Sequence, residues 1–544
     1  MSAPSIEANG ASRKGSATAG GQAPVHAAHP VPNSAPLTLA QWLGFICLVM
    51  GNFLAILDIQ VVASSLLDIQ AGLSASSEDM AWVQSAYLIA EVVAIPLSGF
   101  LSRLLSTRNF FMMAAGGFTL MSLAAAFAWN IESMIFFRAL QGFFGGGMIP
   151  TTMAAIFTLF PKERQMKAQV LVGLVSTMGP VIGPTLGGYL TALYSWHWLF
   201  LINILPGFAI VAGVWRFVNI DRGDWSLAKS IDYVGIVALA CFLGALEYAL
   251  EEGPRHSWFE DGRIVFAVAL SVAGSIAFFW RSFTAPTPVV DLRSLANKNF
   301  ALACLFTFCL GVVLYGTNFV TPLYLGTVRG FSSMQIGEQM AAAGVVMFVM
   351  APVVGILSSK FPKRYIVAAG LAGLGYSSYL AAHLTEQWGF WELLPSQLLR
   401  GASLISCFIP LSALSMGTLP PPLIKGASAL FNLMRNLGGA FGLAYLNTLL
   451  TTRQAYHWQQ LIPAVTAGRM ETDQALAATT QAYQALGNPA PDTAALEALA
   501  QRIKLQASVL TFNDLFLVMA ILATVVLLAV PLLKEASAHA DGVH

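Results

Sequence analysis

The stretch Gly99-Phe100-Leu101-Ser102-Arg103 has a counterpart further along the chain in Gly355-Ile356-Leu357-Ser358-Ser359-Lys360. Each stretch closes a long apolar run and leads into basic residues. A pattern that returns in this way predicts that the chain consists of two related halves. Parallel repeats of six helices each are a known way of building a protein inside a membrane.

Apolar runs recur along nearly the whole chain of 544 residues, of which 56% are hydrophobic and only 10% are charged. The mean hydropathy is +0.67, whereas soluble domains carry about a quarter of charged residues. A helix needs roughly 20 residues to cross about 30 Å of hydrocarbon. The sequence therefore predicts an all-α membrane protein.

Hydropathy predicts fourteen membrane-spanning helices. They lie near residues 41–67, 80–104, 109–129, 132–158, 167–193, 197–218, 232–251, 262–283, 298–325, 335–358, 364–383, 391–416, 424–451 and 508–534. Two halves of six helices account for twelve of these spans, so the pair 232–251 and 262–283 is interpreted as an insertion between the halves.

This division gives the predicted domains of the chain. They are a disordered cytosolic tail (1–40), an N-terminal six-helix bundle (41–218), the inserted pair with its linkers (219–297), a C-terminal six-helix bundle (298–534) and a cytosolic tail (535–544). The C-terminal bundle contains a long polar loop at 452–506, which is rich in Ala and Gln and has amphipathic helical stretches.

Charged residues are distributed unevenly between the loops. Loops after even-numbered spans are basic, as at Arg103 and Lys162, whereas loops after odd-numbered spans lean acidic, as at Glu132 and Glu386. The positive-inside rule places the basic loops in the cytosol, and an even number of spans then places both termini there too. The loop 452–506 is accordingly expected outside the cytosol.

Several classes of protein are disfavoured by composition and spacing. A net charge of +1 gives no field that would attract nucleic acid. The five cysteines lie inside apolar runs without the spacing of a metal site, so no metal or cofactor is expected. The eight histidines lie mostly in tails and loops, which argues against a membrane-embedded enzyme. The sequence shows no repeated filter loop, which argues against a channel.

Five motifs follow one another on the expected spans. They are Leu57–Val62 in the first span, the post-span-two stretch 99–108, Phe136–Gly142 in the fourth, Gly179–Gly188 in the fifth and Trp196–Asn203 at the start of the sixth. In this order they resemble the major facilitator superfamily, and specifically its fourteen-span drug:proton antiporter branch of the EmrB and QacA type, closest to the EmrB type. The resemblance covers about residues 41–534. It departs from the family at Gln60 (usually Thr), Ala63 (usually Asn) and Arg103 (usually Asp).

The resemblance implies a major facilitator fold and a proton-coupled multidrug efflux transporter. Such a pump exports amphipathic or hydrophobic toxic compounds by alternating access from the inner membrane of a bacterium. EmrB-like pumps work with a periplasmic adaptor of the EmrA type and an outer-membrane channel, so both are implied as partners. The alternative is a dedicated exporter of one metabolite, such as a fatty acid, a siderophore or an antibiotic.

Three charged residues at membrane depth are the candidates for proton coupling: Asp58 in the first span, Glu91 in the second and Arg138 in the fourth. A charge inside the bilayer costs from about 2.5 kcal/mol upward, so such residues are usually paired or functional. Asp58 and Arg138 lie at depths compatible with contact, and a permanent structural ion pair is the alternative. For Glu91 the alternative is a neutral, hydrogen-bonded core residue.

Other polar residues in the spans are expected to line a substrate cavity between the halves. These are Gln60, Gln141, Asn318, Gln397, Arg400 and Asn432. Glu247 lies near a span end and is interpreted as a side chain that reaches the membrane surface.

The fifth span carries a candidate gating motif. Gly179, Gly183 and Gly187 stand four residues apart on one face, and Pro184 and Gly188 lie beside them. Such a face allows close helix packing, and proline weakens the backbone hydrogen bonds, so the helix could rock against a neighbour. Close packing without a gating role is the alternative.

Overall fold

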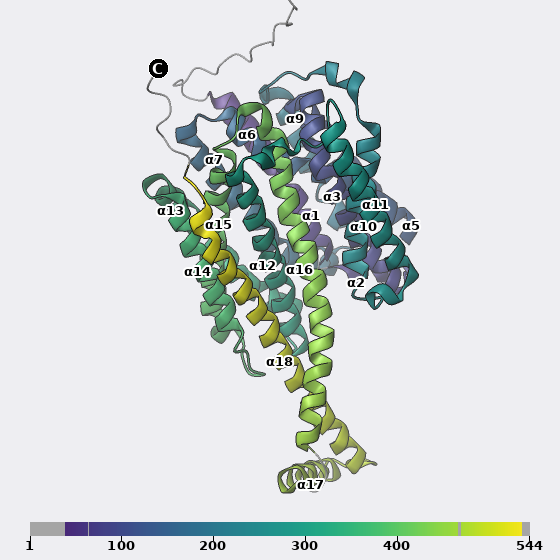
Figure 1. Ribbon diagram of the computed structural model, residues 1–544. Coiled ribbons are helices and arrows are strands. Elements are labelled where there is room, and N and C mark those ends of the chain that lie inside the picture. The colour runs from purple at the N-terminus through teal and green to yellow at the C-terminus, as the bar shows by residue number, and fades with distance from the viewer. Residues whose placement is uncertain (1–37, 64, 466–468, 536–544) are drawn as a thin grey trace, which may run out of the picture. The chain divides into compact units, whose positions relative to one another are not determined.

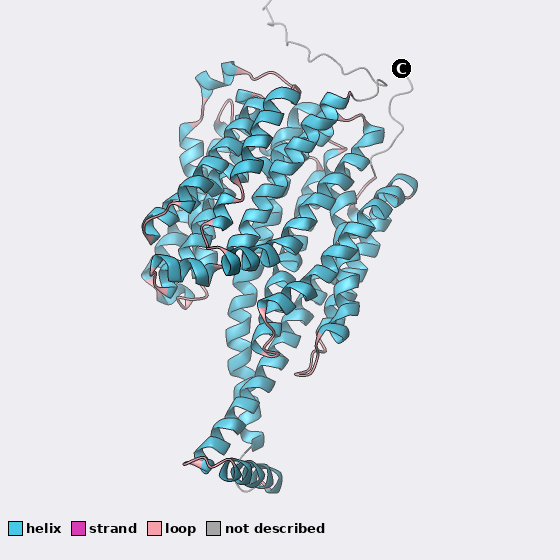
Figure 2. Ribbon diagram, turned by 180° about the vertical axis from the view of Figure 1, so that it is seen from behind, coloured by secondary structure: helices cyan, strands magenta, loops and turns pink. Residues whose placement is uncertain are grey.

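A computed structural model describes residues 38–63, 65–465 and 469–535 (Figure 1). This part of the chain folds into helices joined by loops, and no strand occurs within it (Figure 2). It belongs to one compact unit. The tails predicted at 1–40 and 535–544 lie almost entirely outside the described residues.

The N-terminal half contains the predicted first six spans. Its helices are α1 (Leu39–Ala63), the short α2 (Leu66–Leu73), α3 (Ser77–Leu105), α4 (Thr107–Ala126), α5 (Ile131–Gly146), α6 (Met148–Leu159), α7 (Lys162–Leu193), α8 (Trp198–Leu201) and α9 (Ile204–Phe217). The fourth span is divided into α5 and α6 at Gly147, and the sixth is divided into α8 and α9 at Asn203.

The inserted pair and the C-terminal half follow. Their helices are α10 (Tyr233–Glu252), α11 (Gly262–Thr284), α12 (Lys298–Thr327), α13 (Ser333–Lys360), α14 (Lys363–Ala381), α15 (Phe390–Met416), α16 (Ile424–Leu461), α17 (Met470–Ala485) and α18 (Pro491–Ala529). Short 3₁₀ turns lie at Trp225–Ser230 (η1), Trp258–Glu260 (η2), Leu292–Ala296 (η3), Pro421–Leu423 (η4), Ile462–Val465 (η5) and Val530–Leu532 (η6).

Polar side chains mark where many of these helices begin. Asn130, Asp232, Asp261, Asn297 and Ser332 each accept a hydrogen bond from a backbone N–H in the first turn of α5, α10, α11, α12 and α13, respectively. These N–H groups have no partner within the helix, so the caps stabilise the helix starts by about 1 kcal/mol each.

Each predicted span corresponds to one helix, or to two helices in the fourth and sixth spans. Eleven spans among the described residues are long and apolar enough to cross a membrane by themselves. The spans that correspond to α7, α14 and α16 do not meet this criterion. The all-helical membrane fold is confirmed, and the number fourteen is consistent with the structure and stays a prediction.

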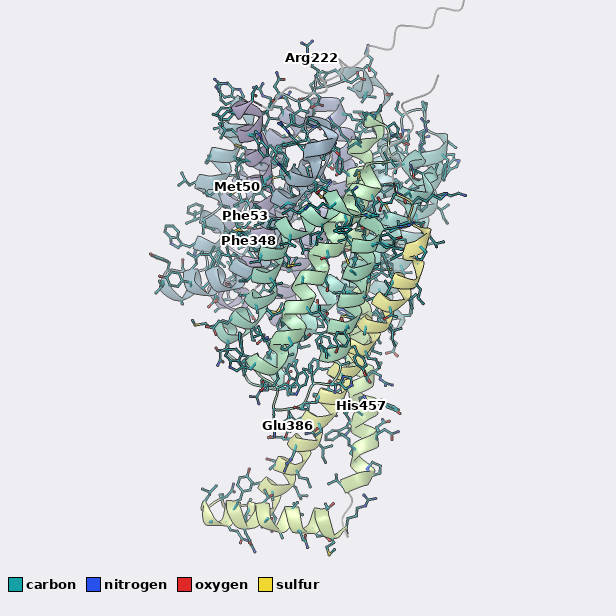
Figure 3. The ribbon with its side chains drawn as sticks, turned by 90° about the vertical axis from the view of Figure 1, so that its left-hand side faces the viewer. Met50, Phe53, Arg222, Phe348, Glu386 and His457 are labelled. Atoms are coloured by element: carbon teal, nitrogen blue, oxygen red, sulfur yellow. The ribbon has the colours of Figure 1, made fainter. Side chains whose placement is uncertain are left out.

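The two stretches that first indicated a repeat lie at equivalent interfaces between the halves. In the first, Gly99 of α3 lies against the backbone of Lys425 and Gly426 at the start of α16. In the second, Gly355 of α13 lies against Val170 of α7. We call this the basic-loop end of the bundle, because the basic loops gather here, and Figure 3 labels Arg222 at this end.

The segment 452–506, predicted as a loop, is largely helical. Helices α16 and α18 continue beyond the bundle, and α17 lies between their far ends (Figure 1). Asp514 of α18 accepts hydrogen bonds from Arg453 Nε (2.6 Å) and pairs with His457 Nε2 (2.8 Å) where the extension begins. Glu386 and His457 both lie in this region in Figure 3. We call this extension the hairpin and the end of the bundle that carries it the hairpin end.

The inserted pair packs beside the two halves rather than apart from them. Helices α10 and α11 pack against each other, and Arg281 Nη2 of α11 lies 2.8 Å from Asp232 Oδ1, the residue that caps α10. Helix α10 also contacts α3 of the N-terminal half and α16 of the C-terminal half. The insertion therefore covers a place where both halves meet.

Candidate functional site

Asp58 of α1 and Arg138 of α5 form a buried ion pair. Arg138 Nη1 lies 2.6 Å from Asp58 Oδ2, and neither side chain is exposed. The same guanidinium donates to Gln141 Oε1 (2.8 Å) and, through Nε, to the carbonyl of Val83 (3.2 Å). Its carbon lies 4.3 Å from the centre of the Tyr87 ring, so a cation–π contact adds to the ion pair.

Two further donors complete the environment of the Asp58 carboxylate. Gln141 Nε2 donates to Asp58 Oδ1 at 3.1 Å, and Asn203 Nδ2 donates to the same oxygen at 2.7 Å. Asn203 is the N-cap residue that precedes α9, and it makes no side-chain cap there because its amide faces Asp58 and Ser122 instead. The helix break in the sixth span thus positions Asn203 as a hydrogen-bond donor to the Asp58 carboxylate.

A cavity of about 280 Å³ lies between the halves. Gln60 and Glu91 line it from the N-terminal half, and Asn318, Arg400 and Arg435 line it from the C-terminal half. Most of the remaining wall is apolar, with residues such as Leu88, Ile149, Leu314, Ile405, Phe408 and Phe431. Apolar walls with a few polar groups are typical of small-molecule sites.

Asp58 and Arg138 are not among the described residues that line this cavity. Glu91 lines it, and its side chain packs against Gly146 of α5, the helix that carries Arg138. The three predicted coupling residues therefore form two neighbouring sites: an accessible acid and an enclosed ion pair.

The predicted cavity residues separate into two groups. Gln60, Asn318 and Arg400 line the cavity. The structure differs from the prediction for the other three. Gln141 binds the ion pair, Asn432 donates to the carbonyl of Ser428 one turn earlier (2.9 Å), and Gln397 is buried in α15 away from the described cavity wall.

The glycine face of α7 packs against α1. A Cβ atom on Gly179 would lie 2.6 Å from Ile56 Cγ2, and one on Gly183 would overlap the Cβ of Gln60. Gly187 is buried, whereas Gly188 faces open space. Pro184 lies within α7, but its side chain is outside the described residues. Because Gln60 also lines the cavity, this packing adjoins the cavity wall.

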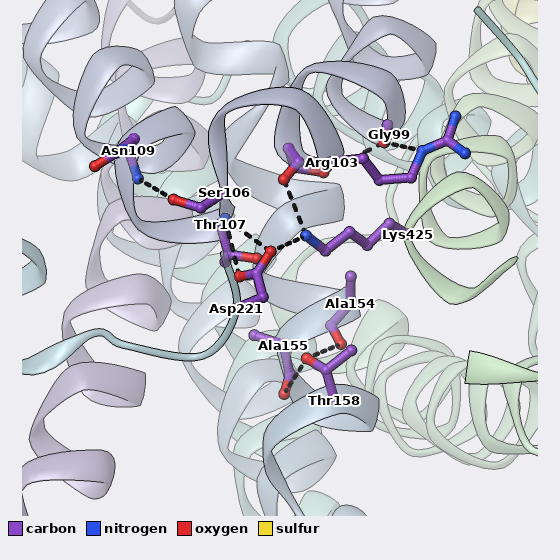
Figure 4. Close-up of polar contacts among 11 residues, drawn as sticks. Gly99, Arg103, Ser106, Thr107, Asn109, Ala154, Ala155, Thr158, Asp221 and Lys425 are labelled. Carbon is purple, nitrogen blue, oxygen red and sulfur yellow. Dashed lines mark hydrogen bonds and ion pairs between the residues drawn. The ribbon is translucent and has the colours of Figure 1, made fainter. Parts of the chain in front are cut away.

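Contacts join the halves at the basic-loop end. Lys425 Nζ donates to the carbonyl of Ser102 (2.9 Å) and pairs with Asp221, which also accepts a hydrogen bond from the N–H of Thr107 (Figure 4). Arg103, at the position of the family's usual Asp, donates to the carbonyl of Gly99 within α3. The carboxylate that pairs with Lys425 therefore comes from Asp221, outside α3, and not from position 103.

Further hydrogen bonds join the halves at this end. Ser428 Oγ of α16 donates to the carbonyl of Pro150 in α6 (2.7 Å), and Ser412 Oγ of α15 donates to Gln169 Oε1 of α7 (3.1 Å). Because these bonds satisfy polar groups that are buried at the interface, opening this end requires their replacement by water or other partners.

The family model of the Major Facilitator Superfamily matches residues 48–443, which is most of the chain. The chain belongs to the Major Facilitator Superfamily. As a member, it is a multi-pass membrane transporter of small molecules and not an enzyme. The predicted family and fold are confirmed.

Three relatives in this superfamily come from bacteria. The chain is 46% identical to the colistin resistance protein EmrB of Acinetobacter baumannii, over 88% of this chain and 94% of that protein. It is 27% identical to the fatty acid resistance protein FarB of Neisseria gonorrhoeae (91% and 96% covered). It is 26% identical to the multidrug export protein EmrB of Escherichia coli (77% and 82% covered).

Solved structures of the superfamily share the fold. The proton:xylose symporter XylE aligns with a TM-score of 0.58 at 12% identity, covering 91% of this chain and 96% of XylE. The human organic anion transporter MFSD10 aligns with a TM-score of 0.55 at 14% identity, covering 89% and 99%. At these identities the likeness establishes the Major Facilitator Superfamily fold alone.

Sequence reasoning missed several residues of the site. Asn203 ends a motif that indicated the superfamily, so its presence was visible but its contact with Asp58 was not. Asp221 is an acid in a basic loop, which is a weak signal for an ion pair. The interpretation of Glu247 needs correction, because its side chain is buried and lines the cavity instead of reaching the membrane surface.

Proposed function

We propose that this transporter exports amphipathic or hydrophobic toxic compounds in exchange for protons, by alternating access. The observation that carries the proposal is the cavity between the halves, where apolar walls surround the carboxylate of Glu91 and the guanidinium groups of Arg400 and Arg435. Ionisable groups are costly inside a membrane protein and usually mark a transport pathway. Relatives named for multidrug export and for colistin and fatty acid resistance support this reading.

Asp58 is the proposed principal coupling carboxylate, with Glu91 as a second acid. Arg138 is proposed to link them, because it pairs directly with Asp58 and lies on α5, the helix that packs against Glu91. A proton or a cationic cargo that arrives at Glu91 changes the electrostatic balance at Arg138. Rearrangement of Arg138 then frees Asp58 to exchange a proton, so cargo and proton compete for one cation.

The glycine face of α7 is the proposed gating element. It packs closely on α1 beside the cavity, so small rotations of α7 change the cavity wall at Gln60. In the described state the halves are joined at the basic-loop end, which supports an outward-facing conformation if that end is cytosolic.

The transporter is proposed to lie in the inner membrane of a bacterium, with both termini in the cytosol. The basic loops support this orientation. The hairpin then projects outside the cytosol, where it is proposed to contact an EmrA-like periplasmic adaptor that leads to an outer-membrane channel. Its length supports this role, because about 55 residues far exceed the usual two to eight between packed helices.

Gradient-driven export by purified protein in liposomes tests the coupling scheme. Ligand-driven proton movement and cargo efflux are measured together for wild type, Asp58→Asn and Glu91→Gln. We expect Asp58→Asn to abolish efflux driven by a pH gradient, and Glu91→Gln to reduce it. If Asp58→Asn still drives uphill efflux at the native rate while Glu91→Gln does not, the two roles must be exchanged.

A dedicated exporter of one metabolite is the second candidate. It is favoured by Arg400, whose Nε and Nη1 atoms have no hydrogen-bond partner among the described residues although the side chain is 5% exposed. A guanidinium in this state suits the carboxylate of a fatty acid, or the acidic groups of some siderophores and antibiotics. Testing cells with and without the transporter against a panel of compounds separates the candidates, since a dedicated exporter protects against one class alone.

A further inference from the structure

Two acidic side chains of the inserted pair face the same cavity as Glu91. Glu247 and Glu251 lie one turn apart on α10, which places them on one face of the helix. Both are among the residues that line the cavity, together with Glu91 of α3. Three carboxylates from two helices therefore meet on one side of the cavity.

Glu247 has the properties of a group that awaits a partner. Its residue is only 5% exposed, and its Oε2 atom makes no hydrogen bond with any described residue. A buried carboxylate oxygen that has neither water nor a donor is costly, so such groups in folded proteins are normally satisfied. Because the residue Glu247 is also among those that line the cavity, a group bound in the cavity is a candidate for the missing partner.

The other acids of α10 are satisfied by the protein. Glu251 accepts a hydrogen bond from Ser85 Oγ of α3 at 3.3 Å. Glu252 is as buried as Glu247, but it pairs with Arg255 (3.4 Å) and lies 3.6 Å from His256 Nδ1. It is not among the described residues that line the cavity. Burial of an acid on this helix is thus compatible with a protein partner, and Glu247 differs from Glu251 and Glu252 because its Oε2 atom has none among the described residues.

The charges around Glu247 also favour a cationic partner. Glu251 and Glu91 are the charged groups whose fields act on its carboxylate, and both are acids. Arg435, the cation on this side of the cavity, acts on Glu91 and on Tyr315. No described cation is among the charged groups that act on Glu247, so the charges around its carboxylate favour a cationic partner.

We propose that Glu247, with Glu251 and Glu91, forms a subsite for the cationic group of an amphipathic cargo. The apolar remainder of the cargo packs against the apolar walls of the cavity, to which Leu88 and Leu314 belong. The inserted pair then has a role in substrate selection. This subsite rests on the proposed export function, because it specifies which class of compound the exporter takes.

Two ions of nearly the same shape and opposite charge provide the test. Binding of tetraphenylphosphonium (cation) and tetraphenylborate (anion) is measured at one fixed pH for purified wild type, Glu247→Gln, Glu251→Gln and Glu252→Gln. We expect Glu247→Gln to weaken the affinity for the cation by about tenfold or more, because a charge-assisted contact in a buried site is lost. Affinity for the anion should stay within about twofold, and Glu252→Gln should bind both ions like wild type.

Other results overturn the subsite. It is wrong if Glu247→Gln binds the cation as tightly as wild type, if it loses both ions equally, or if wild type binds only the anion. Glu247→Asp, which keeps the charge, guards against a folding defect: it should recover part of the cation affinity in protein with a native melting temperature. Failure of recovery despite native melting also counts against the proposal.

The binding measurement separates this inference from the proposed function. Binding needs no proton gradient, so charge-selective loss at Glu247 can be seen whether or not transport is coupled. If the protein exports neutral compounds along a gradient but does not bind the cation, the proposed export function holds and the proposed subsite is wrong. If the cation binds at Glu247 but no gradient-driven export is found, the proposed subsite holds and the proposed export function is wrong.

Discussion

Lys425 Nζ at the start of α16 lies 2.5 Å from Asp221 Oδ2, a carboxylate in the segment that joins α9 to the inserted pair. The same ammonium donates to the carbonyl of Ser102 at the end of α3. The family's usual Asp in this region is replaced by Arg103. A carboxylate from outside the helix therefore joins the halves at the basic-loop end.

Removing this carboxylate should favour opening of the basic-loop end. Both side chains are partly buried, at 14% and 26% exposure, so loss of the charge-assisted contact in Asp221→Asn should cost about 1–3 kcal/mol in this conformation. Spin labels at the exposed Lys167 and Lys360 would report a larger population of long distances between α7 and α13. Asp224→Asn, which alters a nearby local cap only, is the matched control. An unchanged distance distribution in Asp221→Asn would show that the pair does not hold this end.

The buried pair of Asp58 and Arg138 should show non-additive effects on stability. Asp58→Asn leaves a buried guanidinium without its counter-charge, and breaking one side of such a pair costs about 3–5 kcal/mol. Arg138→Gln leaves the opposite defect, and the double variant should be more stable than the sum of the two losses predicts. Thermal melting of the purified variants measures this. Additive losses would contradict a direct energetic coupling.

Gly183→Ala should impair both packing and transport. Its new Cβ would overlap Gln60, and α1 must shift to admit it, at a cost of about 1–3 kcal/mol. Gly188→Ala adds the same methyl group on the same helix where nothing lies within 4 Å, so it should melt and transport like wild type. Melting temperature and cargo efflux in liposomes are the measurements. Equal behaviour of the two variants would exclude the close approach at Gly183 as a requirement.

Shortening the hairpin should separate transport from resistance in cells. Replacing residues 462–490, between the ends of α16 and α18, by a short flexible linker leaves the cavity and the ion pairs at Asp514 in place. Proton-coupled efflux by the purified protein should then persist, whereas resistance of whole cells to toxic compounds should be lost. Loss of efflux in liposomes as well would assign the hairpin to the transport cycle itself.

Much of the fold could be predicted from hydropathy, because most of the spans are continuous apolar runs. The breaks at Gly147 and Asn203 could not, since the same residue types lie inside unbroken helices, as Gly142 does in α5 and Asn318 in α12. The hairpin was predicted as a loop for a related reason. A helix that leaves the membrane no longer needs apolar residues, so hydropathy falls within 452–506 although the helices continue.

Contacts of the site could be predicted where an unpaired charge inside the membrane would cost too much free energy. Contacts that depend on the packing of the helices could not. An acid and an arginine at similar depth have strong reason to meet, and Asp58 and Arg138 do. The position of Glu247 near a span end suggested a route to the membrane surface, but the sequence could not show that α3 and α16 cover it. Likewise, Gln141 is a polar residue within the fourth span, which suggested a place in the cavity. Its amide oxygen instead accepts from Arg138, and its amide nitrogen donates to Asp58.

Helices α16 and α18 give the hairpin a mechanical property. They are 38 and 39 residues long, and a helix of this length extends for about 57 Å. Helix α16 begins beside Ser102 at the basic-loop end and passes the cavity at Arg435 before it reaches the hairpin. If this helix moved as a rigid rod, a tilt of about 10° would move its far end by roughly 10 Å. A tilt of α16 during turnover would therefore displace the tip of the hairpin. A neighbouring protein could sense the state of the cavity there without contacting the cargo.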